Sequence, residues 1–490
     1  MSLHLIYDDT AVVPAGLRAL VGVDRYGSLV FQRRSRLEAM RSLAAAAGAQ
    51  FVHLHEVAER AALLERLREA DLEETFLLCA SHIVPVSSED ALSVFLKQLQ
   101  YVPTAMYVPV EGTRDRSGWL LMRTGLLSQF LLKQEQRDVA GFFDQYAEAF
   151  VEVRDRVRLI DVSEERTLLD FLSGQFDARH FNAIAHDEYT VTKRSRDRAK
   201  MKREFDFYRL VPPQMQMFLV QPFDFQDDGT TASYRMERLC VPDMALQWMH
   251  AAFSPAEFER FLAHIFHFFS IRSERRAAKA EAHAVQQALY VDKVRSRIEM
   301  LERAPEYAAL RPLLERACGG IAALVDRYLA LWDRMRRRLP CDRLVAGHGD
   351  PCFSNVLYSK SSQYLKLIDP RGAESEADLY TDPYYDIAKL SHSVVGNYDF
   401  INLGKFDIHV DERLHLRLQI ENPPAPWAAE LFRRHLTRAG YDFELTRLCE
   451  ASLFISMMPL HIDRPRKVLG FAINAANLLD ELTGEGRKNT

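Results

Sequence analysis

The chain has 490 residues, of which 48% are hydrophobic and 27% are charged, and its formal net charge is −5. This length favours two or three domains with ordinary globular cores, and the charge gives the whole chain no attraction to nucleic acid or an anionic membrane. The six cysteines form no C-x-x-C pair, so we expect reduced thiols rather than a disulfide framework or a cysteine-based zinc site.

The N-terminal residues do not have the pattern of a secretory signal. Residues 1–10 lack a basic segment and contain Asp8 and Asp9. No stretch of the chain reaches about 18 uninterrupted apolar residues, the length that a membrane-spanning helix needs. We therefore expect a cytoplasmic protein without a membrane span.

Residues 1–173 alternate short apolar runs with helical patterns. Helices are predicted at 36–47, where Gly48 follows as a C-terminal signal, and at 57–69. The predicted strands are 3–7, 50–55, 76–80, 105–110, 119–123 and 156–160. This alternation predicts an α/β domain with a largely parallel sheet, which ends near residues 173–180.

Residues 174–242 have the pattern of a small β-rich unit. Two strands are expected within 181–193 around a turn at His186 and Asp187, and two more at 217–225 and 233–239. A helix at 198–210 is inserted between them, and two prolines follow it.

Residues 243–490 are mostly helical in pattern. The start of one helix is predicted at Pro255, because Ser254 and Glu257 have capping-box spacing and a proline is favoured at the first helical position. Another long helix is expected at 321–338, just before the most informative loop of the chain.

That loop reads His348-Gly349-Asp350, then Asn355, and Asp369 follows after a short hairpin. Phosphoryl transfer needs a carboxylate that orients the acceptor hydroxyl and takes its proton, together with oxygen ligands for Mg²⁺. One tight loop can point an aspartate and an asparagine five residues later into one cleft. The second aspartate can complete the metal site.

The order His-Gly-Asp-x-x-x-x-Asn followed by Ile-Asp resembles the signature of the aminoglycoside phosphotransferase and choline kinase superfamily, which shares the protein-kinase fold. The resemblance implies that Asp350 is the catalytic base and that His348 braces its loop. It further implies that Asn355 and Asp369 are Mg²⁺ ligands and that Asp386 supports the catalytic loop.

The resemblance extends upstream, over about residues 175–480. It places Lys193 on the α- and β-phosphates of ATP or GTP, with Glu204 as its ion-pair partner. It places Met236 and Glu237 in the strand and hinge that contact the base. The turn at residues 186–188 departs from the family pattern because it has no glycine-rich phosphate loop.

The N-terminal region more weakly resembles a nucleotidyltransferase of the kind fused to small-molecule kinases in surface-polysaccharide pathways. It lacks the glycine-rich, arginine-containing start of the active enzymes, since Asp8-Asp9-Thr10 follows the first strand. The resemblance therefore implies a diverged copy.

Taken together, the sequence predicts an α/β domain (1–173) followed by an α+β, two-lobed kinase-like domain with an N-lobe (174–242) and a C-lobe (243–490). The expected activity is γ-phosphate transfer to a small alcohol, amino alcohol or sugar, with no nucleic-acid partner and with the oligomeric state open. The alternatives are a nucleotide-binding pseudokinase scaffold, which the missing glycine loop favours, and a bifunctional kinase and nucleotidyltransferase. A protein kinase is a weaker alternative, because no activation segment separates Asp369 from Asp386.

Overall fold

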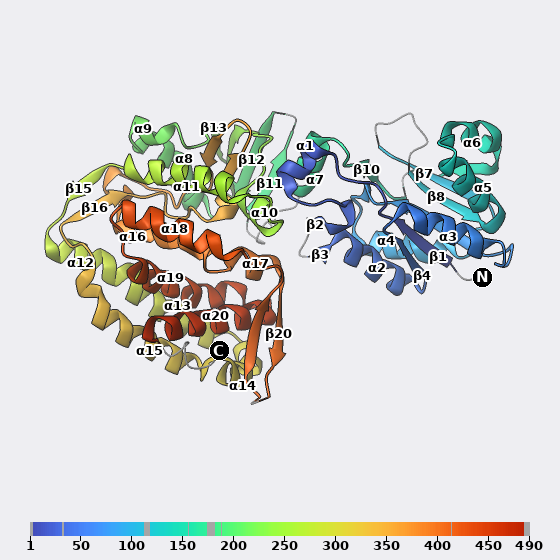
Figure 1. The fold of residues 1–490 in the computed structure, drawn as a ribbon. Helices are drawn as coiled ribbons and strands as arrows, with labels where there is room; N and C mark the ends of the chain where they lie inside the picture. Colours follow the sequence, from blue (N-terminus) through green and yellow to red (C-terminus); the bar gives the residue numbers. More distant parts are fainter. Residues whose placement is uncertain are drawn as a thin grey trace. The chain divides into compact units, whose positions relative to one another are not determined.

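The structure is a computed structural model that describes residues 3–31, 34–111, 118–154, 156–173, 182–187, 189–412 and 414–484. The chain divides into two compact units, Met1–Phe176 and Asp177–Thr490, each of which is described by itself (Figure 1). Within the described residues, no helix is both long enough and apolar enough to cross a bilayer.

The first unit is built on a six-stranded mixed sheet in the order β4-β1-β5-β8-β7-β9. In that order the strands are Gln50–Leu54, Leu3–Asp8, Thr75–Ala80, Gly118–Arg123, Ala105–Pro109 and Phe150–Glu152. β1 runs parallel to β4 and β5, but β8 runs antiparallel to β5 and β7. The expectation of a largely parallel sheet is therefore wrong at β8. The connection from β7 to β8 spans only residues 110–117, which is shorter than the dozen or so residues that a parallel crossover needs.

Helices cover both faces of this sheet (Figure 1). Side chains alternate along β1, so that Leu5 packs with α2 and α4 on one face while Ile6 packs with α3 and α5 on the other. The capping box of Ser35 starts α2, and Gly48 ends it with a left-handed φ of 71°, as predicted. The helices of this unit are Ala15–Val21 (α1), Arg36–Ala47 (α2), Val57–Leu67 (α3), Glu89–Leu99 (α4), Thr124–Glu135 (α5), Val139–Tyr146 (α6) and Glu165–Ser173 (α7).

The last predicted strand of this unit lies elsewhere. β10 (Leu159–Asp161) pairs antiparallel with β6 (Ile83–Pro85) in a separate two-stranded sheet. A second small ribbon joins β2 (Val30–Phe31) to β3 (Arg34–Ser35). The strand expected at 156–160 therefore does not extend the main sheet.

The second unit begins with a four-stranded antiparallel sheet in the order β11-β12-β14-β13. These strands are Asn182–His186, Thr190–Ser195, Ala232–Glu237 and Pro222–Asp227. Helix α8 (Arg198–Leu210) has the predicted bounds and packs Met201 and Phe205 against the sheet. β13 starts later than the expected residue 217, because the short helix α9 (Pro213–Gln216) and the turn after it occupy that part of the chain.

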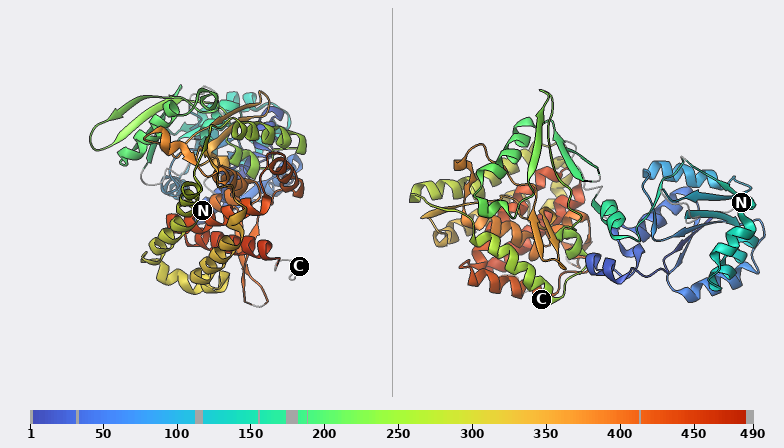
Figure 2. Two further views of the ribbon diagram at one scale, coloured as in Figure 1. Left: turned by 90° about the vertical axis from the view of Figure 1, so that its left-hand side faces the viewer. Right: turned by 90° about the horizontal axis from the view of Figure 1, so that it is seen from above.

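The rest of the second unit is a helical body (Figure 2). Its core lies among α13, α15, α16, α19 and α20, and α19 is buried along nearly its whole length. The helices are Met244–Met249 (α10), Pro255–Ser270 (α11), Lys279–Gln287 (α12), Lys293–Glu302 (α13), Tyr307–Cys318 (α14), Ile321–Met335 (α15), Pro383–Val394 (α16), Tyr398–Leu403 (α17), Pro426–Arg438 (α18), Phe443–Met457 (α19) and Pro465–Thr483 (α20). The predicted capping box of Ser254 and Glu257 is confirmed at the start of α11.

Short strands carry the loops of interest across this body. β15, β16 and β19 form one small sheet, while β17 pairs with β18 and β20 pairs with β21 as hairpins. Their bounds are Glu274–Arg276 (β15), Arg343–Ala346 (β16), Val356–Ser359 (β17), Tyr364–Leu367 (β18), Tyr380–Thr381 (β19), Phe406–Val410 (β20) and Leu416–Ile420 (β21). The loop predicted to carry chemistry lies between β16 and β17, and Asp369 follows β18.

Candidate active site

The backbone of the loop after β16 is held from below by Asp386. This carboxylate on α16 accepts hydrogen bonds from the backbone N–H of His348 (2.9 Å) and of Gly349 (2.8 Å). Arg272 forms an ion pair with it at 3.2 Å, and both side chains are almost fully buried. Gly349 has a left-handed φ of 87° and lies against Arg371, where a Cβ would approach the Arg371 side chain to 2.5 Å. The loop is therefore fixed before any ligand binds.

His348 lies in the buried part of the loop that Asp386 holds, which we call its base. It does not lie among the partly exposed side chains at the open end, which we call the mouth. Its side chain is fully buried, and its Nδ1 accepts a hydrogen bond from the backbone N–H of Asp350 at 3.3 Å. Burial lowers its pKa below the usual 6.5, so the imidazole is neutral at neutral pH. These contacts suit a residue that positions the loop.

Asp350 presents a carboxylate that is partly open to solvent, with 39% of its side chain exposed. Desolvation would raise its pKa, but Lys389 lies 2.9 Å away and holds the pKa below its usual value. The carboxylate is therefore ionised at neutral pH, as a group that accepts a proton must be. Asn355 donates its Nδ2 to the backbone oxygen of Asp350 at 3.0 Å, so its amide oxygen is the atom suited to bind a cation.

Asp369 lies beside the loop that carries Asp350 and Asn355. The backbone N–H of Ile368 donates to the backbone oxygen of Asn355 at 3.0 Å, and this bond places the end of β18 next to the loop. Asp369 has a left-handed φ of 56° and keeps 39% of its side chain exposed. One amide oxygen and one carboxylate from adjacent segments form a hard donor set that fits Mg²⁺. In this chain the residues that would hold the ion are Asn355 and Asp369.

Lys193, on β12, connects the four-stranded sheet to these loops. Its ammonium group lies 2.6 Å from Glu204 on α8 and 2.9 Å from Asp369, and its side chain is almost fully buried. Tyr234 donates its hydroxyl to the same oxygen of Glu204 at 3.0 Å. Burial alone would lower the pKa of Lys193, but the charges of Asp369 and Glu204 outweigh it and raise the pKa. The lysine is therefore a permanent cation.

A small pocket lies next to Lys193 and Asp369. Its walls include Glu204, Tyr234 and Met236, and its apolar side is formed by Leu219, Val220 and Leu367. The pocket has a volume of about 20 Å³ and connects these apolar walls to the carboxylate of Asp369, the partner of Lys193. Met236 lines this pocket, whereas its neighbour Glu237 is exposed at the end of β14.

The turn between β11 and β12 is organised around a carboxylate. Asp187 accepts hydrogen bonds from the backbone N–H groups of Tyr189 (2.8 Å) and Thr190 (2.7 Å) and from the Thr190 hydroxyl (2.7 Å). These bonds lower its pKa to about 2, with the Thr190 hydroxyl bond the largest cause, so Asp187 is charged. The backbone N–H groups of Tyr189 and Thr190 are therefore already paired. A phosphate near this turn would be repelled by the negative charge of Asp187.

A cavity of about 370 Å³ has Arg371, which follows Asp369, in its lining. Its wall includes a π-helical turn (Ala288–Asp292), a rare distortion that is frequent at functional sites. Three of the lining residues are cationic: Lys293, Arg297 and Arg371. The backbone N–H of Arg371 donates to the backbone oxygen of His348 at 2.9 Å, so the cavity adjoins the loop of Asp350.

Sequence reasoning missed Lys389, Lys293 and Arg297. Lys389 carried a signal, because it lies three residues after Asp386, a spacing that places two side chains on the same face of a helix. The two cavity cations carried none, since α13 has the composition of an ordinary solvated helix.

No protein-family model and no curated protein sequence matches the chain. The apo structure of a thermostable mutant of aminoglycoside phosphotransferase APH(4)-Ia aligns with 66% of this chain and 99% of its own, at 11% identity and a TM-score of 0.33. The ternary complex of such a mutant with AMP-PNP and hygromycin B covers 66% and 100%, at 12% identity and a TM-score of 0.33. Choline kinase from Cryptosporidium parvum Iowa II covers 64% and 88%, at 13% identity and a TM-score of 0.32. Because these identities and TM-scores are low, we base the function on the geometry of the site alone.

Proposed function

We propose that the chain is a small-molecule kinase that transfers the γ-phosphate of ATP or GTP to a hydroxyl group. The proposal is carried by a continuous line of contacts from Lys193 to Asp369, and on through the backbone of Asn355 to Asp350. In this proposal residues 174–242 form the nucleotide-binding lobe and residues 243–490 the helical lobe of a kinase-like fold. Residues 1–173 form an α/β domain related to nucleotidyltransferases.

The mechanism is in-line transfer with four roles. Asp350 orients the acceptor hydroxyl and accepts its proton, and Lys389 keeps that carboxylate ionised. Lys193 binds the α- and β-phosphates, while Asn355 and Asp369 hold Mg²⁺. When bound, Mg²⁺ would neutralise charge on the phosphates. Catalysis by this chain then comes from positioning and charge neutralisation, as is general for phosphoryl transfer.

The cavity beside the loop supports a finer statement about the acceptor. Lys293, Arg297 and Arg371 line it, and Lys293 also donates to the hydroxyl of Tyr385 at 2.8 Å. Three cations in one cavity favour an acceptor that carries a carboxylate or phosphate as well as its hydroxyl. We therefore propose a sugar or alcohol with an acidic group, in preference to an amino alcohol.

The second candidate is a pseudokinase scaffold that binds nucleotide without transferring phosphate. The charged turn at Asp187 favours it, because a backbone already bound to a carboxylate cannot cradle phosphates. The ionised Asp350 favours the kinase, because a scaffold has no need for a carboxylate kept ready to accept a proton.

The test is nucleotide turnover by the full chain with Mg²⁺. ATP and GTP are offered separately with sugars, amino alcohols, sugar acids and sugar phosphates, and the phosphorylated product is identified by mass spectrometry. Asp333→Asn serves as a control, because Asp333 is an exposed carboxylate on α15. Turnover in the wild type and the control but not in Asp350→Asn supports the kinase. Nucleotide binding without any product supports the scaffold, and pyrophosphate release from CTP and a phosphomonoester supports a bifunctional enzyme.

A further inference from the structure

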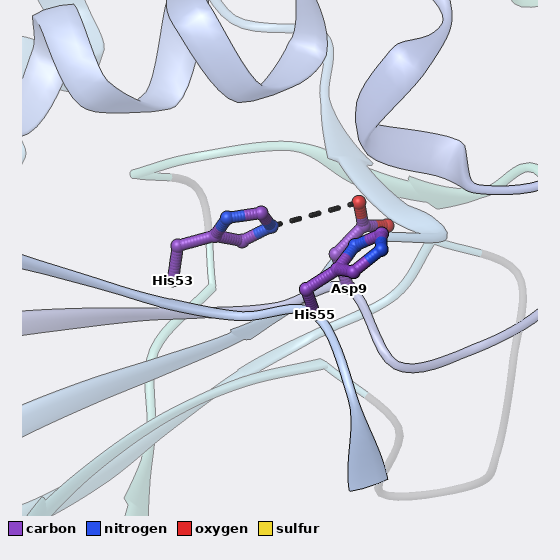
Figure 3. Close-up of side chains that lie close together, drawn as sticks. All are labelled: Asp9, His53 and His55. Carbon is purple, nitrogen blue, oxygen red and sulfur yellow. Dashed lines mark ion pairs between the residues drawn. The ribbon is translucent and has the colours of Figure 1, made fainter. Parts of the chain in front are cut away.

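A second group of chemically reactive side chains lies in the first unit, where β1 and β4 end. These strands are parallel, with Tyr7 opposite His53 and Asp8 opposite Leu54, and the backbone N–H of Asp9 continues the pairing to Leu54 at 2.8 Å. Side chains alternate between the faces of a sheet, so Asp9, His53 and His55 fall on one face. Figure 3 shows the three side chains together at this edge.

The three side chains are close enough to share one ion. A ligand atom from each of Asp9, His53 and His55 lies within 4.8 Å of the other two, and Asp9 Oδ2 lies 3.7 Å from His53 Nε2. Ligand atoms around a tetrahedral zinc ion are roughly 3.4 Å apart, because each lies about 2.0–2.2 Å from the metal. Small side-chain rotations would therefore complete the coordination.

The environment of Asp9 leaves one oxygen for a further partner. Asp9 is only 2% exposed, and its Oδ1 accepts a hydrogen bond from the backbone N–H of Gly27 at 3.0 Å. A Cβ at Gly27 would collide with Oδ2, so the missing side chain keeps space beside that oxygen. Oδ2 faces His53 at a distance too long for a hydrogen bond.

His53 also has an atom without a hydrogen-bond partner. Its Nε2 is buried and has no hydrogen-bond partner among the described residues. A buried polar atom without a partner is destabilising, and a cation between this nitrogen and the Asp9 carboxylate would supply the partner. His55 keeps 53% of its side chain exposed and lies 3.6 Å from Glu56, so an ion can enter from the solvent side.

We propose that Asp9, His53 and His55 bind one divalent transition-metal ion of the Zn²⁺ class. Two imidazoles and one carboxylate suit Zn²⁺ and its neighbours in the first transition row, whereas Mg²⁺ and Ca²⁺ prefer oxygen ligands alone. Three protein ligands leave a fourth position for water or an anionic ligand, the pattern of a catalytic rather than a structural zinc site. The site lies where the carboxyl ends of parallel strands meet, a common place for ligands in α/β folds. This proposal is independent of the kinase activity.

The experiment measures Zn²⁺ binding by untagged full-length protein that has been treated with a chelator and dialysed. Isothermal titration with Zn²⁺ is expected to give one site per chain, and excess Mg²⁺ is not expected to compete. His53→Ala and His55→Gln are each expected to weaken this site at least about 100-fold, since even residues behind the ligands are worth about 10- to 100-fold in affinity. Co²⁺ substitution is expected to give an absorption spectrum that both variants lose.

The control is His283→Ala, which removes an exposed histidine from the second unit. Unchanged stoichiometric binding in this control, together with the loss in the His55→Gln variant, supports the proposal. His55 is half exposed, so this variant is expected to fold even if His53→Ala does not. No stoichiometric Zn²⁺ site in the wild type, or a site that survives both substitutions, would overturn the proposal.

Discussion

The loop between β16 and β17 has buried carboxylate contacts at its base and partly exposed carboxylates at its mouth, and the two serve opposite purposes. At the base, Asp386 is fully buried and has two backbone N–H donors and the Arg272 guanidinium as partners. At the mouth, Asp350 and Asp369 each have one lysine partner and keep 39% of the side chain exposed. A carboxylate whose bonding capacity is used up holds the chain together, whereas a carboxylate with a lone pair to spare and one cation beside it can take part in chemistry.

The same contrast separates the two lysines from Arg272. Lys193 and Lys389 each neutralise a carboxylate that a ligand can still reach, while Arg272 neutralises one that no ligand reaches. Substitutions at the mouth should therefore change activity more than stability, and substitutions at the base should change stability first.

The largest expected effect is on turnover in Asp350→Asn. The amide keeps the shape but cannot accept a proton, so kcat should fall by about 10³-fold or more. Urea denaturation should show a smaller loss of unfolding free energy than any change at Asp386. A variant that keeps its turnover, or that unfolds as easily as an Asp386 variant, would contradict the assigned difference.

Asp386→Ala is expected to lower the free energy of unfolding by about 3–5 kcal/mol, because it leaves the buried guanidinium of Arg272 without a counter-charge. Two backbone N–H groups of the loop also lose their acceptor. Asp333→Asn, on an exposed face, should leave the urea midpoint unchanged. If Asp386→Ala unfolds at the wild-type midpoint, the carboxylate does not hold the loop.

The sequence revealed this site where its parts are local. Asp350 and Asn355 share one loop, so their spacing alone predicts that they lie close together, and the structure joins them by a hydrogen bond. Lys389 belongs to a helix packed from elsewhere, so its ion pair with Asp350 depends on the fold.

In the first unit, too, the residues of the candidate site are brought together by the fold and not by local sequence. Asp9 and the two histidines come together only because β4 lies beside β1, and no local pattern encodes that strand order. The antiparallel direction of β8 follows from the connection before it, residues 110–117, which is too short for a parallel crossover, whereas the alternation of apolar runs carries no information on strand direction. Helix bounds such as those of α8 were predictable because the caps and prolines that set them are local.

Lys193→Met is expected to raise the KM for nucleotide by roughly 10- to 100-fold, since a hydrogen bond to a charged group contributes about 1.5–3 kcal/mol. Glu204 stays partly neutralised by Lys200 at 3.5 Å, so the variant should fold. Lys202→Met is the control, because Lys202 is an exposed lysine on α8, the helix that carries Glu204. Equal KM values in both variants would show that Lys193 does not bind phosphate.

Lys389→Met is expected to change the pH dependence of activity, because Lys389 is the cation beside Asp350. In the wild type Lys389 lowers the pKa of Asp350, so activity that depends on this carboxylate persists below the usual aspartate pKa of 3.8. The ion pair between Asp350 and Lys389 likewise contributes stability above pH 3.8. This contribution is lost as the pH falls through the lower pKa that Asp350 has in the folded protein. Without the lysine, burial raises the pKa, so the acid limb of kcat/KM should move to higher pH. Lys405→Met, at a mostly buried lysine paired with Glu421, should leave the acid limb in place.

The smallest expected effect concerns the acceptor cavity. An ion pair between partly exposed groups contributes about 0.2–1 kcal/mol, so Arg297→Ala should raise the KM for an acidic acceptor by roughly two- to five-fold. A neutral acceptor of the same size should show no change, because it has no charge for Arg297 to bind. Adding Arg371→Ala should raise the KM for the acidic acceptor further and again leave the KM for the neutral acceptor unchanged. If the neutral acceptor loses as much as the acidic one, the arginines shape the cavity without recognising charge, and only the carboxylates at the mouth distinguish this site from the rest of the surface.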